Sequence, residues 1–300
     1  MIITGRTRIV GIFGDPVHHS LSPVIQNAAF EAAGLDFAYV PFRVHPGDDL
    51  KSATESVLAL NLRGVNITIP HKVGVMEYLD EIDPHARAVG AVNTVVNENG
   101  ELKGYNTDGL GYVRSLVESV GFEVKGKRVV MAGAGGAARS ILYALLSEGP
   151  ASVVVANRSV DKARKLIEEF AEGAEGEFAK TLGSVEVTSA TLDTAFLATG
   201  ADGADLVVNT TSLGMDSNPP LDITLSGLNS GAVVSDIVYS PLETPLLATA
   251  RALSFAVHDG LSMLIAQGAV GFELWTGAKA PVDAMRQAAE ALLGVVGNRR

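Results

Sequence analysis

Short runs of apolar, often β-branched residues alternate with helical patterns along almost the whole chain. Runs of this kind are typical of strands buried on both faces, and an intervening helix lets successive strands lie parallel. The alternation therefore predicts an α/β protein whose parallel sheets are covered by helices. We expect strands at 7–13, 37–44, 63–69, 127–133, 152–158, 184–188, 204–210, 232–238 and 255–259. We expect helices at 23–34, 48–62, 71–80, 137–149, 160–171, 260–277 and 281–296.

Turn residues refine this pattern in three places. Residues 91–106 contain two strand patterns joined at Asn99-Gly100, a dipeptide that is typical of a tight hairpin. Pro41 has no N–H to give to a neighbouring strand, so the strand at 37–44 is expected at a sheet edge or a bulge. The Gly- and Glu-rich segment 172–183 is expected to form a surface loop.

Composition bounds the size of the protein and excludes several classes. A length of 300 residues corresponds to about two domains. A content of 47% hydrophobic and 19% charged residues is sufficient for packed cores. The chain has no cysteine, which excludes disulfides and thiolate metal sites. The formal net charge is -11 and no stretch is rich in Lys and Arg, so a nucleic-acid partner is not expected.

No segment has the pattern of a signal peptide or a membrane anchor. The first residues lack a long apolar core, and no run of about eighteen apolar residues occurs. We therefore expect no membrane association and a cytoplasmic location. The sequence leaves a monomer and a homodimer both open.

The sharpest local signal is the glycine loop in VVMAGAGGAARS, residues 129–140. Gly133, Gly135 and Ala138 have the G-x-G-x-x-G/A spacing, directly after a strand and at the start of a helix. The first glycine allows the tight turn, the second lets a pyrophosphate approach the backbone, and the small Ala138 lets helix and strand pack closely. Free N–H groups at the helix start favour phosphate. This context predicts a dinucleotide site.

The end of the next strand indicates which dinucleotide binds. An NAD site would carry an acidic residue there to hold the ribose 2′-hydroxyl, whereas this chain has Asn157, Arg158 and Ser159. The forked guanidinium of Arg158 can pair with a 2′-phosphate, and Lys162 or Arg164 can assist from the next helical turn. The sequence therefore favours NADP(H), while a solvated loop residue is the alternative for Arg158.

Polar residues in the first 110 positions stand in short motifs, and each has a purely structural explanation when taken alone. Ser22 in S-L-S-P is a good helix N-cap. Asn66 and Thr68 alternate on one face of a strand and can face water. Lys72 fits the surface of a short helix, and Asp108 fits the cap of the helix that follows it.

Together these motifs resemble the shikimate dehydrogenase family. Their order is S-L-S-P, V-N-I-T-I-P-H-K, G-A-V-N-T, N-T-D-G, G-A-G-G-A, N-R-S and Q-G-A, and the similarity extends from about residue 8 to residue 277. The resemblance implies NADPH-dependent reduction of 3-dehydroshikimate to shikimate, a step of aromatic amino-acid biosynthesis. It also implies a substrate-binding domain at 1–107 plus 261–300 and a Rossmann-like NADP-binding domain at 108–260.

The resemblance further implies roles for individual residues. Ser20 and Ser22 would bind the substrate carboxylate, and Lys72 and Asp108 would form the catalytic pair. The ring hydroxyls would be held by Asn66, Thr68, Asn93, Asp108 and Gln267, and Tyr239 would also reach the substrate. The cofactor would contact Gly133, Ala134, Gly135, Gly136, Ala137, Asn157, Arg158, Ser159, Ile237, Gly260 and Met263.

These residue types suit the implied chemistry. Hydride arriving at a ketone leaves a developing alkoxide, which needs a proton and a nearby positive charge. A lysine ammonium supplies both without a metal. The carboxylate of Asp108 can accept hydrogen bonds from Lys72 and from a substrate hydroxyl, which fixes their geometry. Serine hydroxyls can donate to a carboxylate while remaining neutral.

Four other positions need comment. Ser262 stands where the family commonly has a glycine, which puts the local packing near the nicotinamide in mild doubt. His18 and His19 are adjacent, and we expect their rings to point apart in an extended loop. A metal site needs more ligands than this pair, so no metal is expected. His258 is expected to be structural.

Three alternatives remain open at this point. The first is a quinate/shikimate dehydrogenase with relaxed substrate and NAD use, against which the two serines and Asn157-Arg158-Ser159 argue. The second is an enzyme acting on an amino-substituted analogue, which no residue excludes. The third is an NADP-binding regulator without activity, against which the presence of both Lys72 and Asp108 argues.

Overall fold

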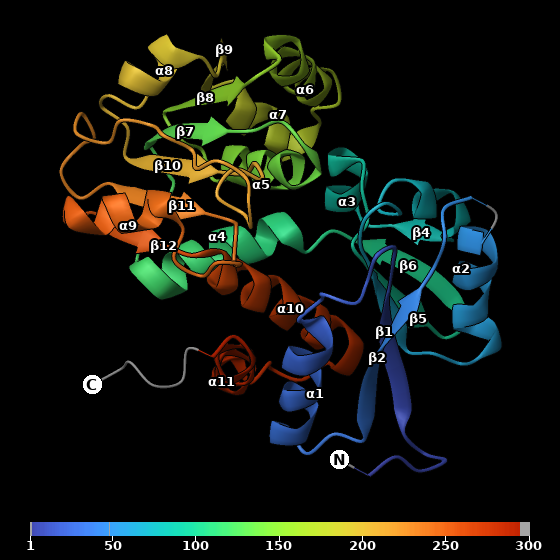
Figure 1. Cartoon of the computed structure of the whole chain (residues 1–300). Helices are drawn as coiled ribbons and strands as arrows, with labels where there is room; N and C mark the ends of the chain where they lie inside the picture. Colours follow the sequence, from blue (N-terminus) through green and yellow to red (C-terminus); the bar gives the residue numbers. More distant parts are fainter. Residues whose placement is uncertain (1, 48, 295–300) are drawn as a thin grey trace. The chain divides into compact units, whose positions relative to one another are not determined.

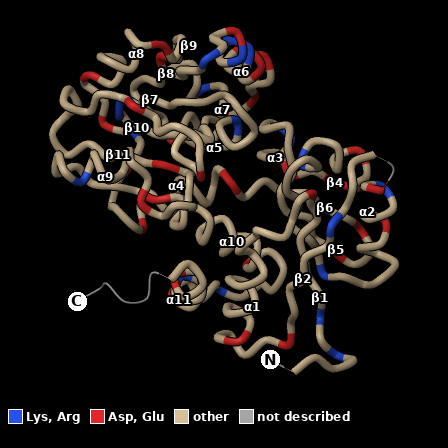
Figure 2. The backbone as a smooth tube through the Cα atoms, in the orientation of Figure 1, with Lys and Arg blue, Asp and Glu red and all other residues tan. Residues whose placement is uncertain are grey.

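The computed structural model describes residues 2–47 and 49–294, and the chain divides into two compact units (Figure 1). Unit 1 comprises Met1–Thr107 and Ile265–Arg300, and unit 2 comprises Asp108–Leu264. Each unit contains a six-stranded sheet with helices against it, so the predicted α/β class is confirmed. Lysine, arginine, aspartate and glutamate are interspersed along the tube in both units (Figure 2).

Unit 1 is built from the first 107 residues together with two helices from the end of the chain. Its strands are β1 (Arg8–Gly14), β2 (Phe37–Arg43), β3 (Gly64–Ile67), β4 (Glu81–Ile82), β5 (Thr94–Glu98) and β6 (Glu101–Tyr105). Its helices are α1 (Ser22–Ala32), α2 (Asp49–Ala59), the 3-10 helix η1 (Gly74–Tyr78), α3 (Pro84–Val89), most of α10 (Gly260–Thr276) and α11 (Val282–Leu292).

The unit 1 sheet is mixed, with the order β2-β1-β3-β5-β6-β4. Strand β1 is parallel to both β2 and β3, whereas β5 is antiparallel to β3 and to β6. The predicted hairpin is present, since Asn99 and Gly100 have φ of 58° and 96° between β5 and β6. The strand with Pro41 lies at a sheet edge, where the missing N–H costs no ladder bond.

Alternation along β3 divides the unit 1 side chains between two faces. Val65 and Ile67 join the core under α2 and η1, and α2 lies on one side of the sheet in Figure 1 with α1 on the other. Gly64 faces α10, because a Cβ atom there would lie 2.4 Å from the indole nitrogen of Trp275. The glycine therefore lets the end of α10 pack directly on the sheet, and the next residue on that face is Asn66.

Unit 2 is a doubly wound parallel sheet. Its strands are β7 (Arg128–Ala132), β8 (Ser152–Asn157), β9 (Glu186–Thr191), β10 (Leu206–Asn209), β11 (Val233–Asp236) and β12 (Ala256–His258). Its helices are α4 (Asp108–Val120), α5 (Gly136–Ser147), α6 (Val160–Glu172), α7 (Gly176–Leu182), α8 (Thr194–Thr199), α9 (Pro245–Ala252) and the first turn of α10.

The strand order β12-β11-β10-β7-β8-β9 makes unit 2 Rossmann-like. The chain enters at the central β7, winds outward to β9, returns to β10 and winds outward in the other direction. The winding reverses between β7 and β10, and ligands of such sheets bind at the carboxyl ends of the strands at this point. Val129 and Met131 pack against α4 and α5, and Val130 and Ala132 pack on the opposite face, the side of α9.

Several predicted elements need correction. The segment predicted as a surface loop at 172–183 contains α7, whose Phe178 stacks on Tyr143 of α5 with 4.3 Å between ring centroids. Phe178 and Leu182 pack against the apolar core of unit 2, and the polar composition of the segment does not reveal these contacts. The short helix α8 was also not predicted. Of the helix expected at 281–296, residues 282–292 are helical and residues 295–296 lie outside the described residues.

No helix within the described residues is both long and apolar enough to cross a bilayer.

Candidate functional site

A buried hydrogen-bonded network joins the polar residues at one edge of the unit 1 sheet. The Asn66 amide donates to the Asn93 carbonyl at 3.1 Å and to the Thr94 hydroxyl at 3.0 Å. Its oxygen accepts from the Tyr39 hydroxyl at 2.7 Å. Asn93 in turn accepts from the backbone N–H of Thr107 at 2.8 Å. All five residues are buried, so the network fixes the side chains in single orientations.

Strand direction explains why these residues meet. Asn66 lies near the carboxyl end of β3, and Asn93 and Thr94 stand at the start of the antiparallel β5. Thr107 follows β6, which runs back alongside β5. These four residues therefore lie at the same end of the sheet's strands. Gln267 of α10 extends the network, because its side-chain oxygen accepts from the Thr107 hydroxyl at 3.5 Å.

The two serines of the S-L-S-P motif lie at the start of α1. Ser22 is buried, and its hydroxyl lies close enough to the Tyr39 hydroxyl to influence the pKa of that group. The prediction that Ser22 caps the helix is wrong, because Leu21 occupies the N-cap position. Instead the Ser20 hydroxyl accepts from the Ser22 N–H at 3.2 Å. Burial raises the pKa of the Tyr39 hydroxyl, and the Ser22 hydroxyl partly opposes that shift.

Thr68 and Lys72 follow β3 and are held by their backbones. The Thr68 N–H donates to the Phe13 carbonyl at 2.9 Å, and its methyl group occupies the space that a Cβ atom at Gly14 would need. The Lys72 carbonyl accepts from the Val92 N–H at 2.8 Å, next to Asn93 in the chain. Both side chains are partly exposed. Seven predicted residues therefore belong to unit 1, namely Ser20, Ser22, Asn66, Thr68, Lys72, Asn93 and Gln267, and hydrogen bonds connect Asn66, Asn93 and Gln267 through Thr94 and Thr107.

Two further predicted residues belong to unit 2. Asp108 is the first residue of α4 and is buried. Its neighbour Gly109 is obligatory, because a Cβ atom there would lie 2.2 Å from the Ser140 carbonyl oxygen of α5. Tyr239 is partly exposed after β11, and burial raises the pKa of its hydroxyl. Lys72 and Asp108 thus come from different units.

The glycine loop has the geometry that its spacing predicts. Gly133 has φ of 116°, and a Cβ atom there would lie 2.4 Å from the Thr210 hydroxyl, so only glycine fits. By contrast, no atom lies within 4 Å of a Cβ position at Gly135 or Gly136, and both are exposed at the start of α5. Ala138 is fully buried against the sheet. The first backbone N–H groups of α5 are therefore open to a phosphate ligand.

Strand register places the residues predicted to bind the 2′-phosphate next to the glycine loop. Ala132 pairs with Ala156 of β8, so the residues after these two strands are neighbours. The amide of Asn157 donates to the Ser159 carbonyl at 2.9 Å, which shapes the turn into α6. Arg158 is exposed and makes no ion pair among the residues that the structure describes. The nearest carboxylate in the sequence, Asp161, pairs with Arg164 at 3.1 Å.

Ile237, Gly260 and Met263 form a second group near β11 and the start of α10. A Cβ atom at Gly260 would lie 2.3 Å from the Ile237 carbonyl oxygen, so glycine lets the helix start against this backbone. Ile237 and Met263 belong to the same apolar cluster. Ser262 donates through its N–H and its hydroxyl to Asp259, at 2.7 and 2.9 Å, so this residue completes the helix cap.

Two buried polar groups of unit 2 have structural contacts. His258 lies between the hydroxyls of Ser115 and Ser235, at 2.7 and 2.8 Å, as expected of a structural histidine. The Asp236 carboxylate accepts from Thr244 at 2.7 Å and from Asn209 at 3.0 Å. Burial raises the pKa of Asp236 to about 6, although these hydrogen bonds oppose the shift.

No cluster of three or more potential metal ligands occurs among the described residues. His18 and His19 do not point apart as expected, because their ring centroids are 3.6 Å apart. The residues that sequence analysis missed are Tyr39, Thr94 and Thr107, which position Asn66 and Asn93. Thr94 and Thr107 lie inside the quoted motifs G-A-V-N-T and N-T-D-G, whereas no local signal marks Tyr39.

Comparisons with known proteins show which family the chain resembles in both units. Residues 12–95 match the model of the shikimate dehydrogenase substrate binding domain, residues 115–218 match shikimate / quinate 5-dehydrogenase, and residues 260–290 match the shikimate 5'-dehydrogenase C-terminal domain. The chain is 46% identical to a shikimate dehydrogenase (NADP(+)) of Geobacter metallireducens, over 98% of this chain and 99% of that protein.

Two solved structures are similar over almost their full length. One is a shikimate dehydrogenase in complex with NADP+, with 40% identity and a TM-score of 0.86 over 97% of this chain and 98% of that chain. The other is shikimate 5-dehydrogenase from Listeria monocytogenes in complex with shikimate and NAD. It is 35% identical, with a TM-score of 0.86 over 95% of this chain and 97% of that chain.

Proposed function

The chain belongs to the shikimate dehydrogenase family of NADP-dependent oxidoreductases, and from that premise we propose the reaction and the roles of its residues. The reaction is the reduction of 3-dehydroshikimate to shikimate with NADPH. The observation that carries this proposal is the buried network around Asn66, in the segment that matches the family's substrate-binding domain. A ligand with several ring hydroxyls and a carboxylate needs such a set of neutral, fixed hydrogen-bonding groups.

In this proposal unit 1 binds the substrate. The hydroxyls of Ser20 and Ser22 donate to its carboxylate. The side chains of Asn66, Thr68, Asn93 and Gln267 hold the ring hydroxyls, and Tyr39 and Thr107 keep the two asparagines in place. Because these groups are already hydrogen-bonded to one another, little rotational freedom is lost when the substrate binds. Tyr239 of unit 2 adds a contact to the substrate.

Unit 2 binds the cofactor. The N–H groups at Gly135 and Gly136 receive the pyrophosphate, because no side chain blocks their approach. Arg158 pairs with the 2′-phosphate, with Asn157 and Ser159 shaping its turn. Ile237, Gly260 and Met263 would hold the nicotinamide. When it is bound, NADPH supplies the hydride.

Lys72 and Asp108 carry the proton chemistry of the proposal. The Lys72 ammonium donates a proton to the substrate oxygen as that oxygen gains negative charge. Its positive charge also stabilises the developing alkoxide before the proton moves. The Asp108 carboxylate accepts hydrogen bonds from Lys72 and from a ring hydroxyl, which orients both. In the reverse direction, neutral Lys72 takes the hydroxyl proton.

Steady-state kinetics test this function directly. Purified protein with shikimate and NADP should produce NADPH absorbance, with a higher kcat/KM than with quinate or with NAD. A higher kcat/KM for quinate with NAD would identify the quinate/shikimate alternative. Turnover only with an amino-substituted analogue would identify the second alternative, and no turnover with any substrate would identify an NADP-binding regulator.

Two predictions lie outside these measurements. The location in the cytoplasm and the choice between monomer and homodimer stay predictions, for which cell fractionation and sedimentation velocity are the direct measurements.

A further inference from the structure

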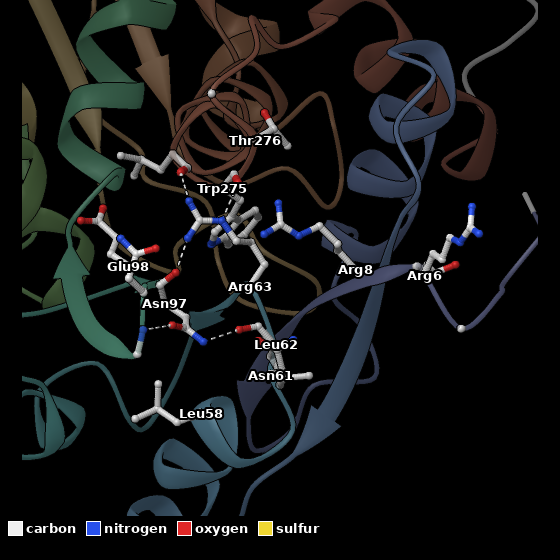
Figure 3. Close-up of a pocket in the computed structure, with 16 residues that line it drawn as sticks. Arg6, Arg8, Leu58, Asn61, Leu62, Arg63, Asn97, Glu98, Trp275 and Thr276 are labelled. Atoms are coloured by element: carbon white, nitrogen blue, oxygen red, sulfur yellow. Dashed lines mark hydrogen bonds between the residues drawn. The ribbon is translucent and has the colours of Figure 1, made fainter.

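A cavity lies in unit 1, away from the Asn66 network. It has a volume of about 800 Å³ and is shown in Figure 3. Its lining comes from the residues before and at the start of β1, the turn from α2 to β3, the β5–β6 hairpin and the end of α10. A volume of this size accommodates an ordinary small-molecule metabolite.

The cavity and the proposed substrate site lie at opposite ends of the strands of the unit 1 sheet. Arg8 and Arg63 stand at the amino ends of the parallel strands β1 and β3, whereas Asn66 and Thr68 lie toward the carboxyl end of β3. Three strand residues span about 10 Å from Arg63 to Asn66. The cavity and the network are therefore separate sites on one sheet, connected by a single short strand.

The cavity is basic although the protein is acidic. Its lining contains the three arginines Arg6, Arg8 and Arg63 and only one acidic residue, Glu98, in a chain of formal net charge -11. Arg6 and Arg8 are exposed, and neither forms an ion pair with a described residue. The Arg8 guanidinium lies 5.5 Å from the ring centroid of Phe37, which supports it from one side. In Figure 3 Arg8 extends toward Arg63 and Trp275.

Arg63 is the fixed member of this group. Its guanidinium donates to the carbonyl oxygens of Trp275 at 2.8 Å, Asn97 and Leu274. These bonds leave part of its five N–H donors available and neutralise none of its charge, because all three acceptors are carbonyls. Burial, and then the nearby Arg8, lower the pKa of Arg63. Two like charges that line one cavity favour any anion that binds between them.

We propose that this cavity binds a small phosphate-bearing metabolite whose ionised oxygens bridge the Arg8 and Arg63 guanidiniums. The planar, forked guanidinium suits phosphate in particular, since it offers two parallel donors. Arg6 adds a third positive charge to the lining, and the amides of Asn61 and Asn99 can bond to the rest of the ligand. Nothing in this proposal depends on the oxidoreductase reaction.

Trp275 provides a readout that is independent of activity. It is the chain's one tryptophan, and it lines the cavity beside Arg63. Titration with inorganic pyrophosphate should give a saturable change in its fluorescence, with an affinity that weakens as salt is added. The glycine loop can also bind pyrophosphate, so the titration is performed in the Arg158→Ala background and repeated with saturating NADP.

Three substitutions decide the location of the site. Arg8→Gln should weaken pyrophosphate binding at least tenfold, and Glu98→Gln should strengthen it severalfold because it removes the one opposing charge. The matched control is Arg251→Gln, which removes another exposed arginine, one that pairs with Glu243 in unit 2. Arg8 is exposed, so thermal melting should be unchanged. The proposal is overturned if Trp275 fluorescence does not respond saturably, or if Arg8→Gln and Arg251→Gln bind pyrophosphate equally well.

Discussion

Unit 1 and unit 2 both present polar groups where parallel strands end, but they hold those groups in opposite ways. In unit 1 the groups are side-chain amides and hydroxyls, buried and bonded to one another around Asn66. In unit 2 they are backbone N–H groups at Gly135 and Gly136 and the exposed guanidinium of Arg158. The first arrangement depends on several distant segments, whereas the second depends on one turn and one residue after a strand.

This difference predicts where stability and ligand binding are coupled. A change inside the unit 1 network leaves buried polar partners without hydrogen bonds, which costs folding free energy as well as affinity. A change on the exposed edge of unit 2 removes a proposed ligand contact and leaves the core as it is. The following substitutions test that contrast, in order of decreasing expected effect.

Replacement of Lys72 should have the largest effect, because it removes a group from the proposed chemistry. Lys72→Ala should lower kcat about 100- to 10,000-fold with a much smaller change in substrate affinity. Its side chain is partly exposed, so the free energy of unfolding should change little. Lys103→Ala, which removes a unit 1 lysine paired with Glu81 at 2.8 Å, is the matched control. Near-normal turnover in folded Lys72→Ala would remove Lys72 from the proposed role.

Asn66→Ala should reduce both stability and substrate affinity. It leaves the buried Tyr39 and Thr94 hydroxyls each without one partner, which corresponds to roughly 2 to 4 kcal/mol of unfolding free energy. The comparison is Asn229→Ala in unit 2, which loses two bonds, at 2.9 and 3.0 Å, at an exposed position. Urea unfolding measures both. An equal loss in the two variants would mean that burial of the network does not set its stability.

Asp236 gives unit 2 a buried polar group of its own. Its pKa rises from 3.8 unfolded to about 6 folded, so the folded state binds more protons between these values and stability falls as the pH rises through them. Asp236→Asn should remove this loss, which amounts to at most about 3 kcal/mol. Unfolding free energies at about pH 4 and pH 7 measure it, and parallel pH profiles for the two proteins would contradict the assignment.

Arg158→Ala should separate cofactor binding from stability. Loss of one charge-assisted contact should raise the KM for NADP roughly tenfold or more, with little change for NAD or for the free energy of unfolding. Arg251→Ala, which removes an exposed arginine of unit 2 that pairs with Glu243 at 3.2 Å, is the control. Equal effects of Arg158→Ala on both cofactors would show that Arg158 does not distinguish them.

The same contrast explains how much could be predicted from the sequence. The glycine loop and the Asn99-Gly100 hairpin depend on consecutive residues, and both have the expected backbone. The strand and helix alternation likewise predicted the α/β class. The partners of Asn66 could not be predicted, because Tyr39 is brought to it across β1 by the sheet. The prediction that Ser22 caps α1 was wrong, because Leu21 is the N-cap residue. The motif contains two serines, and it is the Ser20 hydroxyl that accepts from a backbone N–H, that of Ser22.

One helix has a consequence for how the protein is made. Helix α10 starts in unit 2 and ends in unit 1, where Phe272 stacks on Phe30 and the Gly268 carbonyl accepts from Gln26 at 2.8 Å. While the ribosome is still translating the middle of the chain, the first 107 residues lack this partner. We expect unit 2, which is continuous, to fold during synthesis, and unit 1 to close only after release of the C-terminal segment. Truncation after residue 264 should therefore leave the N-terminal segment prone to aggregation.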